Sequence, residues 1–427
     1  MKRNAVLPMM FCMLTLSPCF TQATPLHPSS DTPFTLIERA ILDIEKPGYL
    51  HVIQNPSNAQ NHLFVSNFKL FGNDRLFSIS NWQKGIVDSS QLRLEIFSSA
   101  AVWPNEARAA DPSLFGQDGV IVSGGFLVPG KATGAVTFIP WKTPTEHFVL
   151  TTPKKGWFYH RTEEYDVNGD GLLDIVTARA LKPMFGKPDG ELLWLENPGT
   201  EPWASTIPWK EHIIGKGPDV HFKVLPKNDA HSFTIISTEF SAKKLSAYQQ
   251  QPDGSFKYVI IDDTLGSAFD IQLADLNNDG HMDLLVSNHE NDHNASVFAY
   301  ELDLQSLTLK NRRTLITGIE TKQKGIQAAS PGPVMAFHPT SQNGSTTNKP
   351  WILISGDGSQ KAHLLVPEKD TSPLDWKYAE HILWNPSSTV GQSTIADIDN
   401  DGLLEVIIPA YDANKIGVFS IRPDLVP

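Results

Sequence analysis

The chain has 427 residues, of which 40% are hydrophobic and 19% are charged, enough for one large repeat architecture or two average domains. Its net charge of -12 argues against a nucleic-acid partner, because phosphate binding needs a surface rich in Lys and Arg. Both cysteines, Cys12 and Cys19, lie near the start of the sequence, so the rest of the chain has no disulfide and no cysteine–zinc site.

Residues 1–23 are typical of a secretory signal peptide. Lys2 and Arg3 precede the apolar run AVLPMMFCMLTL, and the segment ends on TQA, with small residues where a signal peptidase cleaves. The apolar run is short for a membrane span, and no later stretch reaches about 18 apolar residues. We therefore expect a protein of the secretory pathway with no membrane span; an uncleaved N-terminal anchor is the alternative.

Seven apolar runs rich in β-branched residues recur along the rest of the chain. They are HLFVSNF (62–68), GVIVSGGF (119–126), DIVTARA (174–180), FTIISTEF (233–240), DLLVSNHE (283–290), WILISGDG (351–358) and EVIIPAYD (405–412). Their central residues, counted from Val65 to Ile408, are separated by 57, 54, 60, 50, 68 and 54 positions. Seven copies at a similar period predict seven equivalent structural units.

Each unit contains further strand-like runs around its apolar copy. An innermost candidate such as FYHRTEEYD (158–166) precedes the copy, and a second run follows it; a third run follows in the first six units. Gly, Pro, Asn and Asp separate the runs, and no segment keeps a helical period. Four antiparallel strands per unit predict an all-β, seven-bladed β-propeller over 24–427. The approximate blades are 48–103, 104–156, 157–217, 218–266, 267–328, 329–389 and 390–427, the last completed by 34–43.

The N-terminal segment 34–43 supplies the strand that the seventh unit lacks. That unit ends soon after its third strand, whereas IERAIL within FTLIERAILD resembles AEHIL and KEHII, the outer strands of other units. We expect the N-terminal strand to complete the last blade, which removes the open sheet edges at the seam of the ring.

Three acidic loops recur at matching positions between the first and second strands: DVNGDGLLD (166–174), DLNNDGHMD (275–283) and DIDNDGLLE (397–405). The alternating Asp and Asn oxygens, the Gly that permits a sharp bend, a backbone carbonyl at position seven and the carboxylate at position nine make an oxygen cage suited to Ca²⁺. The expected ligands are Asp166, Asn168, Asp170, Leu172 and Asp174, then Asp275, Asn277, Asp279, His281 and Asp283, then Asp397, Asp399, Asp401, Leu403 and Glu405.

These loops are not EF-hands. Position 12 is Thr177, Val286 or Ile408 rather than Glu, and the flanking segments are strands. We expect up to three structural Ca²⁺ ions and no catalytic role for these carboxylates; turns that bind no metal are the alternative.

The three loops, together with LLWLENPG (192–199), resemble the FG-GAP/VCBS-repeat calcium-binding β-propeller superfamily. Its members include integrin-like heads, sugar-binding lectins, polysaccharide lyases and aldos-2-ulose dehydratases, so the resemblance implies a fold and calcium but no single function. In the C-terminal half, SPGPVMAFHP (330–339), ISGDGSQKAHLLVP (354–367) and VIIPAYDANKIGVF (406–419) resemble secreted fungal members, some of them similar to the hetero-Diels–Alderases of tropolone–sesquiterpenoid pathways. No catalytic residue of that group can be matched to this chain.

A ligand site is expected on the face opposite the acidic loops, where the loops between strands two and three surround the central channel. Arg161 is a candidate to hold an oxyanion, enolate or carboxylate, and His221 or His289 is a candidate general acid or base. The candidate substrate-binding residues are Trp157, His160, Arg179, Glu239, Asp270, Asp357, Gln392 and Tyr411. The alternative is a polar channel that holds only water.

Three functions fit these features. The first is an enzyme with a small-molecule pocket at the channel mouth, in its sharpest form a hetero-Diels–Alderase-like pericyclase that joins a terpene to a quinone methide and needs no redox or nucleotide cofactor. The second is a calcium-dependent module that binds glycan or protein, and the third is a sugar lyase or dehydratase. The loops TARALKPMFGKPDG and STEFSAKK differ greatly, which favours one asymmetric pocket over repeated sugar sites.

Asn294 and Asn343 begin Asn-x-Ser sequons and are candidate glycosylation sites in predicted loops. The sequence gives no indication of the oligomeric state.

Overall fold

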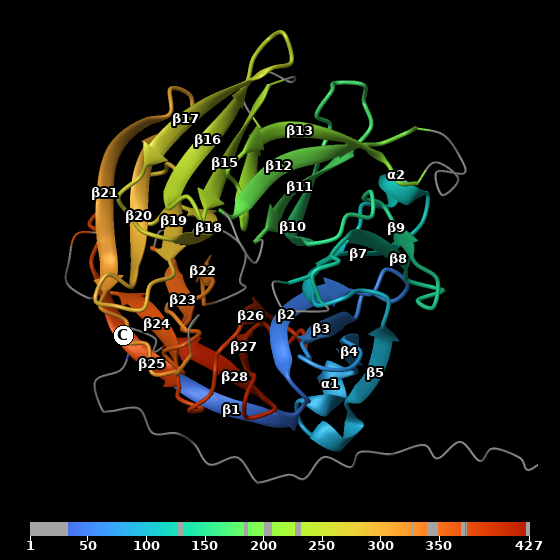
Figure 1. The fold of residues 1–427 in the computed structure, drawn as a ribbon. Helices are drawn as coiled ribbons and strands as arrows, with labels where there is room; N and C mark the ends of the chain where they lie inside the picture. Colours follow the sequence, from blue (N-terminus) through green and yellow to red (C-terminus); the bar gives the residue numbers. More distant parts are fainter. Residues whose placement is uncertain are drawn as a thin grey trace, which may run out of the picture.

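The computed structural model describes residues 33–126, 131–182, 187–199, 207–226, 232–325, 328–339, 349–368, 372 and 374–423. In this part of the chain, the strands form seven four-stranded sheets arranged as blades around a central axis (Figure 1). The predicted seven-bladed propeller is therefore confirmed. The proposed signal peptide lies outside the described residues.

Every blade is antiparallel; in six of them the four strands follow one another outward from the axis, and in the last blade β1 supplies the outer strand. The blades are β2 (Pro47–Gln54), β3 (Asn61–Asn67), β4 (Arg75–Ser80) and β5 (Arg93–Ser98); β6 (Pro104–Ala109), β7 (Gly119–Gly124), β8 (Val136–Pro140) and β9 (Phe148–Val149); β10 (Trp157–Tyr165), β11 (Asp174–Leu181), β12 (Asp189–Glu196) and β13 (Lys210–Lys216); β14 (Phe222–Pro226), β15 (Phe233–Glu239), β16 (Lys244–Gln250) and β17 (Phe256–Asp262); β18 (Ala268–Ala274), β19 (Asp283–Asn288), β20 (Ser296–Asp303) and β21 (Thr308–Thr317); β22 (Val334–Phe337), β23 (Trp351–Ser355), β24 (Ala362–Pro367) and β25 (Tyr378–Trp384); and β26 (Thr394–Ala396), β27 (Leu404–Ala410), β28 (Lys415–Pro423) and β1 (Phe34–Asp43).

The second strands of the blades are the apolar runs that recur in the sequence. Strands β7, β15 and β19 are buried at every position, because a neighbouring blade packs on each face of the sheet. One such interface joins Ile121 and Phe138 of the second blade to Tyr159, Ile175 and Leu193 of the third. Each fully buried side chain of this size stabilises the fold by about 1.5–3 kcal/mol, so the interfaces between blades hold the ring together.

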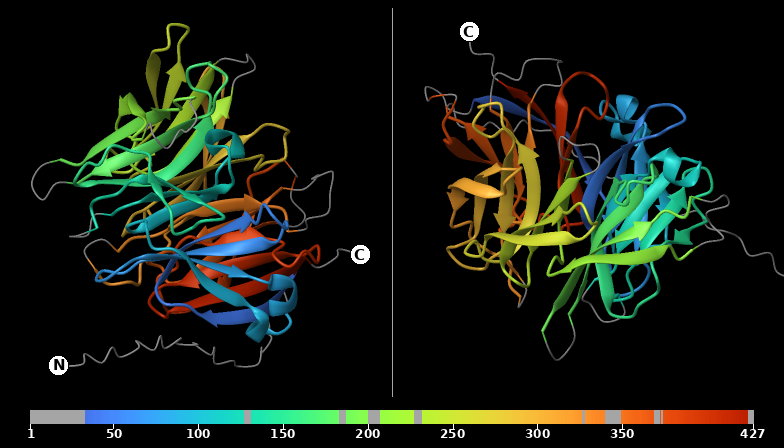
Figure 2. Two further views of the ribbon diagram at one scale, coloured as in Figure 1. Left: turned by 90° about the vertical axis from the view of Figure 1, so that its right-hand side faces the viewer. Right: turned by 90° about the horizontal axis from the view of Figure 1, so that it is seen from above.

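The seam of the ring is closed by β1, as the sequence predicts. β1 pairs antiparallel with β28, with Leu36 opposite Ile421 and Leu42 opposite Ile416. Figure 1 shows the blue N-terminal strand beside the red C-terminal one, and Figure 2 shows the same contact from two further directions. The side chain of Leu36 packs in the core between the sixth and seventh blades, and Leu42 packs in the core between the seventh and first blades.

Short helices occur where the sequence predicts none. They are α1 (Trp82–Gly85), α2 (Pro112–Phe115) and the single 3₁₀ turn η1 (Ser89–Gln91). In α2, the Asp111 side chain accepts a hydrogen bond from the Ser113 amide and Pro112 fixes the first turn, so a local cap suffices. Four residues are too few to show a helical period. No helix among the described residues is long and apolar enough to cross a membrane.

Replacement of the closing contact should weaken the whole ring. We expect Leu36→Ala to lower the free energy of unfolding by about 2–5 kcal/mol, because it leaves a cavity at the seam. Urea denaturation followed by tryptophan fluorescence measures the change. Leu94→Ala, on the exposed face of β5, is the control and should cost less than about 0.5 kcal/mol. Equal losses in the two variants would contradict a special role for the seam.

Candidate functional site

A cavity of about 420 Å³, called here the mouth pocket, opens at one end of the central channel. It collects residues from the first six blades, at the ends where first strands begin and second strands finish. The acidic loops connect the opposite ends of the same strands, so antiparallel pairing separates the two features by the length of a strand. The principal lining side chains are Tyr49, Phe126, Phe158, His160, Asp219, Phe240, Phe269, His289, Glu290 and Asp357.

Aromatic rings form a nearly continuous wall around the mouth pocket. The Phe158 ring lies 5.2 Å from the His160 ring and 6.1 Å from Phe126, measured between centroids. On the other side, Phe269 stacks on His289 at 5.0 Å, and Phe240 lies 6.0 Å from the same histidine. Rings at these separations present large apolar faces and polar edges, so this wall suits a flat or ring-containing apolar molecule.

Three of the lining side chains occupy β-bulges in innermost strands. In β10, Tyr159 pairs with Arg179 and Arg161 with Ala178, which leaves His160 unpaired. Phe269 is unpaired in β18 in the same way, and Tyr49 lies in a corresponding bulge of β2. A bulge interrupts the alternation of side chains and re-aims one of them. Repeated at the same level in several blades, it turns Tyr49, His160 and Phe269 into the pocket.

His289 and Asp357 form a polar end of the mouth pocket. The Nδ1 atom of His289 lies 2.8 Å from the carbonyl oxygen of Pro331, so it carries the proton and donates. Its Nε2 atom lies 4.0 Å from Oδ2 of Asp357. Burial raises the pKa of the Asp357 carboxyl, and the nearby histidine opposes this effect. This end can therefore offer a ligand a carboxyl group and an imidazole nitrogen.

Directly beneath the pocket, His221 and Asp270 form a buried dyad. The Nδ1 atom of His221 lies 2.6 Å from Oδ1 of Asp270, whose other oxygen accepts from the Val334 amide at 2.9 Å. Burial, aided by Arg161, lowers the pKa of His221, which therefore stays neutral at neutral pH. Burial alone would raise the pKa of Asp270, but His221 and Arg161 outweigh it and hold that pKa well below its usual range. The carboxylate thus fixes one tautomer of the imidazole.

Arg161 lies on β10, the innermost strand of the third blade, and is buried between two carboxylates. Its guanidinium is 3.6 Å from Glu106 and 3.7 Å from Asp270, beyond hydrogen-bond distance. Burial alone would lower the pKa of Arg161, but Asp270 and Glu106 reverse this and raise it. The buried nitrogens Nε of Arg161, Nδ1 of His160 and Nε2 of His51 have no hydrogen-bond partner. A small cavity of about 20 Å³, lined by Arg161, Asp270 and Gln392 among others, adjoins this group.

The structure brings together most of the residues that the sequence selected for the channel. His160, His289 and Asp357 line the mouth pocket. His221 contacts it through the rings of His160 and Phe269, at 6.2 and 5.4 Å. Arg161, Asp270 and Gln392 lie one layer deeper.

The placement of Arg179 and Trp157 differs from the prediction. Arg179 lies within β11 rather than in a loop, where it pairs with Glu191 at 2.7 Å and Glu211 at 2.8 Å on the next two strands. Trp157 is buried beneath this guanidinium, and the Cζ atom of Arg179 lies 4.8 Å from the centroid of the Trp157 ring. Both side chains are engaged inside the third blade and do not line the mouth pocket.

Glu239 and Tyr411 also lie outside the pocket. Glu239 ends β15 and accepts hydrogen bonds from the hydroxyls of Ser246 at 2.6 Å and Tyr258 at 3.1 Å. The Tyr411 hydroxyl donates to the Phe68 carbonyl at 2.9 Å, across the seam between the last and first blades. These contacts are within the fold, so neither side chain is available to a ligand in the mouth pocket.

Sequence reasoning missed Tyr49, Asp219 and the phenylalanines of the wall. An aromatic residue in a strand-like run is read as core, and nothing in the sequence marks a bulge that re-aims it. Asp219 accepts backbone hydrogen bonds from Phe240 at 2.6 Å and Ser241 at 2.9 Å, and burial raises its pKa to about 6. It positions the loop that carries Phe240, a role visible only once the two segments meet.

The three acidic loops adopt the same turn. The first Asp of each accepts backbone amides from the far side of the loop; for Asp166 these come from Gly169 at 2.8 Å and Gly171 at 2.9 Å. The glycines at position six of the loops, Gly171, Gly280 and Gly402, have φ of 88°, 86° and 90°, a conformation that a side chain would strain. The amides of Leu172, His281 and Leu403 donate to Asp170, Asp279 and Asp401 at 2.8, 2.9 and 2.8 Å.

The ninth residue ties each loop to its blade. Asp174 accepts from the amides of Val167 at 3.0 Å and Asn197 at 2.8 Å, and Asp283 accepts from Leu276 at 2.9 Å. Glu405 accepts from the Ile398 amide at 3.1 Å and the Ser420 hydroxyl at 2.7 Å. Each turn is therefore built into the strand that follows it.

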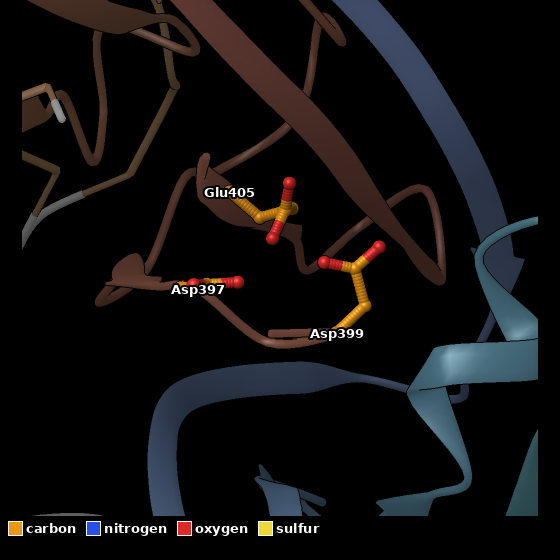
Figure 3. A group of neighbouring side chains, drawn as sticks. All are labelled: Asp397, Asp399 and Glu405. Atoms are coloured by element: carbon orange, nitrogen blue, oxygen red, sulfur yellow. The ribbon is translucent and has the colours of Figure 1, made fainter. Parts of the chain in front are cut away.

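The donor set of the third loop fits Ca²⁺. Carboxylate oxygens of Asp397, Asp399 and Glu405 lie within 4.8 Å of one another, and Figure 3 shows the three groups pointing toward a common centre. Oxygen donors alone are the ligands that Ca²⁺ prefers. In the other two loops Asn occupies the third position, and the amides of Asn168 and Asn277 donate to Asp170 and Asp279 at 2.9 and 3.0 Å. Those loops present fewer converging carboxylates.

Of the two sequons, Asn294 is exposed on the loop between β19 and β20, where its amide donates to Asp292 at 3.1 Å. Asn343 lies outside the described residues.

Neither a protein-family model nor a curated protein matches the chain. Among solved structures, one described as the Dos1 propeller is similar, with a TM-score of 0.41 and 12% identity over 87% of this chain and 81% of that one. This likeness concerns the propeller fold alone. The resemblance to FG-GAP/VCBS proteins and to hetero-Diels–Alderases stays a prediction.

The buried histidines should make stability depend on pH. Burial lowers the pKa of His160 from 6.5 to about 3. Between these two pH values the His160 side chain is protonated in the unfolded chain but stays neutral in the folded protein. Stability should fall as the pH falls from about 6.5, by up to about 1.4 kcal/mol per pH unit for each such histidine. We expect His160→Gln to reduce this slope between pH 6.5 and 4.5, measured by urea denaturation.

His51, whose pKa burial likewise lowers to about 3, provides a second variant, His51→Gln, with the same expected effect. His293→Gln, on an exposed loop, is the matched control and should leave the slope unchanged. A slope that is the same in all four proteins would show that these histidines are accessible to protons in the folded state.

Proposed function

We propose that this propeller binds one small, largely apolar, ring-containing molecule in the mouth pocket and converts it there. The observation that carries the proposal is the union, in one cavity of about 420 Å³, of five aromatic side chains with His160, His289 and Asp357. Ligand pockets of enzymes typically span about 300–1,000 Å³ and combine an apolar lining with a few polar groups. The bulges that aim Tyr49, His160 and Phe269 inward support a site built for a ligand.

Within this proposal, a hetero-Diels–Alderase-like cyclisation is the reaction that the lining supports best. Joining a quinone methide to a terpene alkene requires an apolar enclosure that holds both partners in near-attack geometry. It also benefits from a hydrogen bond to the oxygen on which charge develops. The aromatic wall would supply the enclosure, and the Tyr49 hydroxyl would supply the hydrogen bond.

The reaction can be tested with a tropolone quinone-methide precursor and humulene. We expect the protein to raise the rate and fix the stereochemistry of the adduct, as measured by chiral chromatography. Phe269→Ala should lower the rate by about 10-fold or more, because it removes a wall of the enclosure. Tyr411→Phe, outside the mouth pocket, is the control and should keep the wild-type rate. An unchanged rate with the wild-type protein, or micromolar binding on a glycan array instead, would contradict this reaction.

A lyase or dehydratase acting on a sugar is the second candidate, and the buried dyad favours it. Asp270 orients His221 at 2.6 Å, and Arg161 lies 3.7 Å from the same carboxylate. A histidine base with a nearby guanidinium is a suitable set for abstracting a proton beside a carbonyl and stabilising the enolate. Product analysis with uronides and keto-sugars distinguishes the two reactions, and Asp270→Asn should abolish this one.

We also propose that the acidic loops bind structural Ca²⁺ and that the protein is secreted. The loops share one turn, and three carboxylates converge in the last of them. Asp397, Asp399 and Glu405 would hold the ion by carboxylate oxygens, neutralising charges that otherwise repel one another. Secretion is supported by the sequence of residues 1–23 and by the exposed sequon at Asn294.

Calcium should raise thermal stability without entering the chemistry. An ion present at 100 times its Kd stabilises the folded state by about 2.7 kcal/mol. We expect EDTA to lower the Tm of the wild-type protein, and Asp397→Asn to reduce that response. Asp170→Ala should lower Tm in calcium while the folded fraction keeps its activity. Asp263→Asn, an exposed carboxylate outside the loops, is the control. A Tm that EDTA leaves unchanged would contradict calcium binding.

A further inference from the structure

Arg161 is a buried cation whose Nε atom has no hydrogen-bond partner. Its side chain is 10% exposed, and its Nε atom is buried without a hydrogen bond to any described residue. The nearest carboxylates, at 3.6 and 3.7 Å, lie just beyond hydrogen-bond distance. A buried donor without a partner is costly, and buried polar groups in proteins are almost always paired. An acceptor atom from outside the chain would satisfy this group.

Two neighbouring side chains have the same unsatisfied character and line the mouth pocket. The Tyr49 hydroxyl makes no hydrogen bond with any described residue, and burial raises its pKa, so it remains a donor at neutral pH. His160 is 8% exposed, and its Nδ1 atom is buried without a partner. His160 directly precedes Arg161 in β10, and Tyr49 forms an isolated bridge with Gln392, which lines the small cavity beside Arg161. The three residues therefore lie close together at and beneath the floor of the mouth pocket.

The charges around this floor disfavour an anion. Arg161 is flanked by Glu106 and Asp270, and Asp357 stands at the edge of the mouth pocket near Tyr49. Three carboxyl groups against one guanidinium leave no excess of positive charge for a carboxylate or phosphate ligand. A neutral oxygen accepts hydrogen bonds from the same donors and meets no such repulsion.

We propose that the floor of the mouth pocket, where Tyr49 and His160 line the cavity and Arg161 lies beneath them, recognises one neutral oxygen function of the ligand, a ketone or a hydroxyl group. The apolar body of that ligand would lie against the phenylalanine wall above. This inference rests on the proposed binding of a small molecule in the mouth pocket and specifies its chemical class. It holds for either of the two reactions considered above.

Three probes of nearly equal shape test the inference by isothermal titration of the full chain at pH 7. They are 2-acetylnaphthalene, which carries a ketone; 2-ethylnaphthalene, which lacks the oxygen; and 2-naphthoate, which is an anion. We expect the ketone to bind about 10-fold more tightly than the hydrocarbon, because only the ketone satisfies the buried donors. The anion should bind the weakest of the three.

Two variants locate the oxygen. Tyr49→Phe removes only a hydroxyl that has no partner among the described residues, so the fold should tolerate it. Arg161→Met removes the cation, and Arg161→Lys keeps the charge if the methionine variant unfolds. Both Tyr49→Phe and Arg161→Met should lower the affinity for the ketone several-fold and leave the affinity for the hydrocarbon unchanged. Tyr411→Phe, which removes a hydroxyl outside the pocket, is the matched control.

The outcomes separate this inference from the proposed function. Equal affinities for the ketone and the hydrocarbon, or an equal loss of affinity for all three probes in the variants, would overturn the oxygen site. The donors would then bind water instead of a ligand oxygen. Tightest binding of the naphthoate would overturn the preference for a neutral group. If none of the probes binds, the small-molecule function of the mouth pocket fails as well.

Discussion

The structure depends on closing a ring of sheets so that no blade keeps an unpaired edge at the seam. Here the hydrogen bonds between β1 and β28 perform that closure, and they join residues at the two ends of the chain. Apart from Cys12 and Cys19 the sequence has no cysteine, so the blades are held together by apolar packing and hydrogen bonds rather than by disulfides. The same strand also reaches an acidic loop, since Arg39 lies 3.7 Å from Asp399.

Ring closure also explains where a ligand site can form. Seven innermost strands converge on one axis, and at one end of the channel side chains from six blades meet in the mouth pocket. Regular strands would present alternate residues to the axis and to the neighbouring blade. The bulges at Tyr49, His160 and Phe269 break that alternation at one level. They add side chains that face the channel where it opens. Each bulge removes a few hydrogen bonds between two strands, a small loss of stability compared with the apolar packing of the blade.

The repeat period, the composition of the strands and the missing outer strand of the last unit were enough to predict the fold. All are local patterns: an apolar run of second-strand type, a turn rich in Gly and Asp, and a segment at 34–43 that resembles outer strands. The position of the channel followed from the same patterns, because antiparallel order decides which loops share a face. His160, His289 and Asp357 were found for that reason.

The roles of individual polar residues could not be predicted in the same way. Arg179 pairs with Glu191 and Glu211, so its use depends on the register of three strands. Asp270 and His221 are 49 positions apart and meet only because adjacent blades place their first strands side by side. Arg161 differs from Arg179 in its contacts: its Nε atom has no hydrogen-bond partner, and its nearest carboxylates belong to other blades. An arginine satisfied within its own sheet stabilises that sheet, whereas Arg161 lines a small cavity between blades, and for this reason we include it in the proposed ligand site.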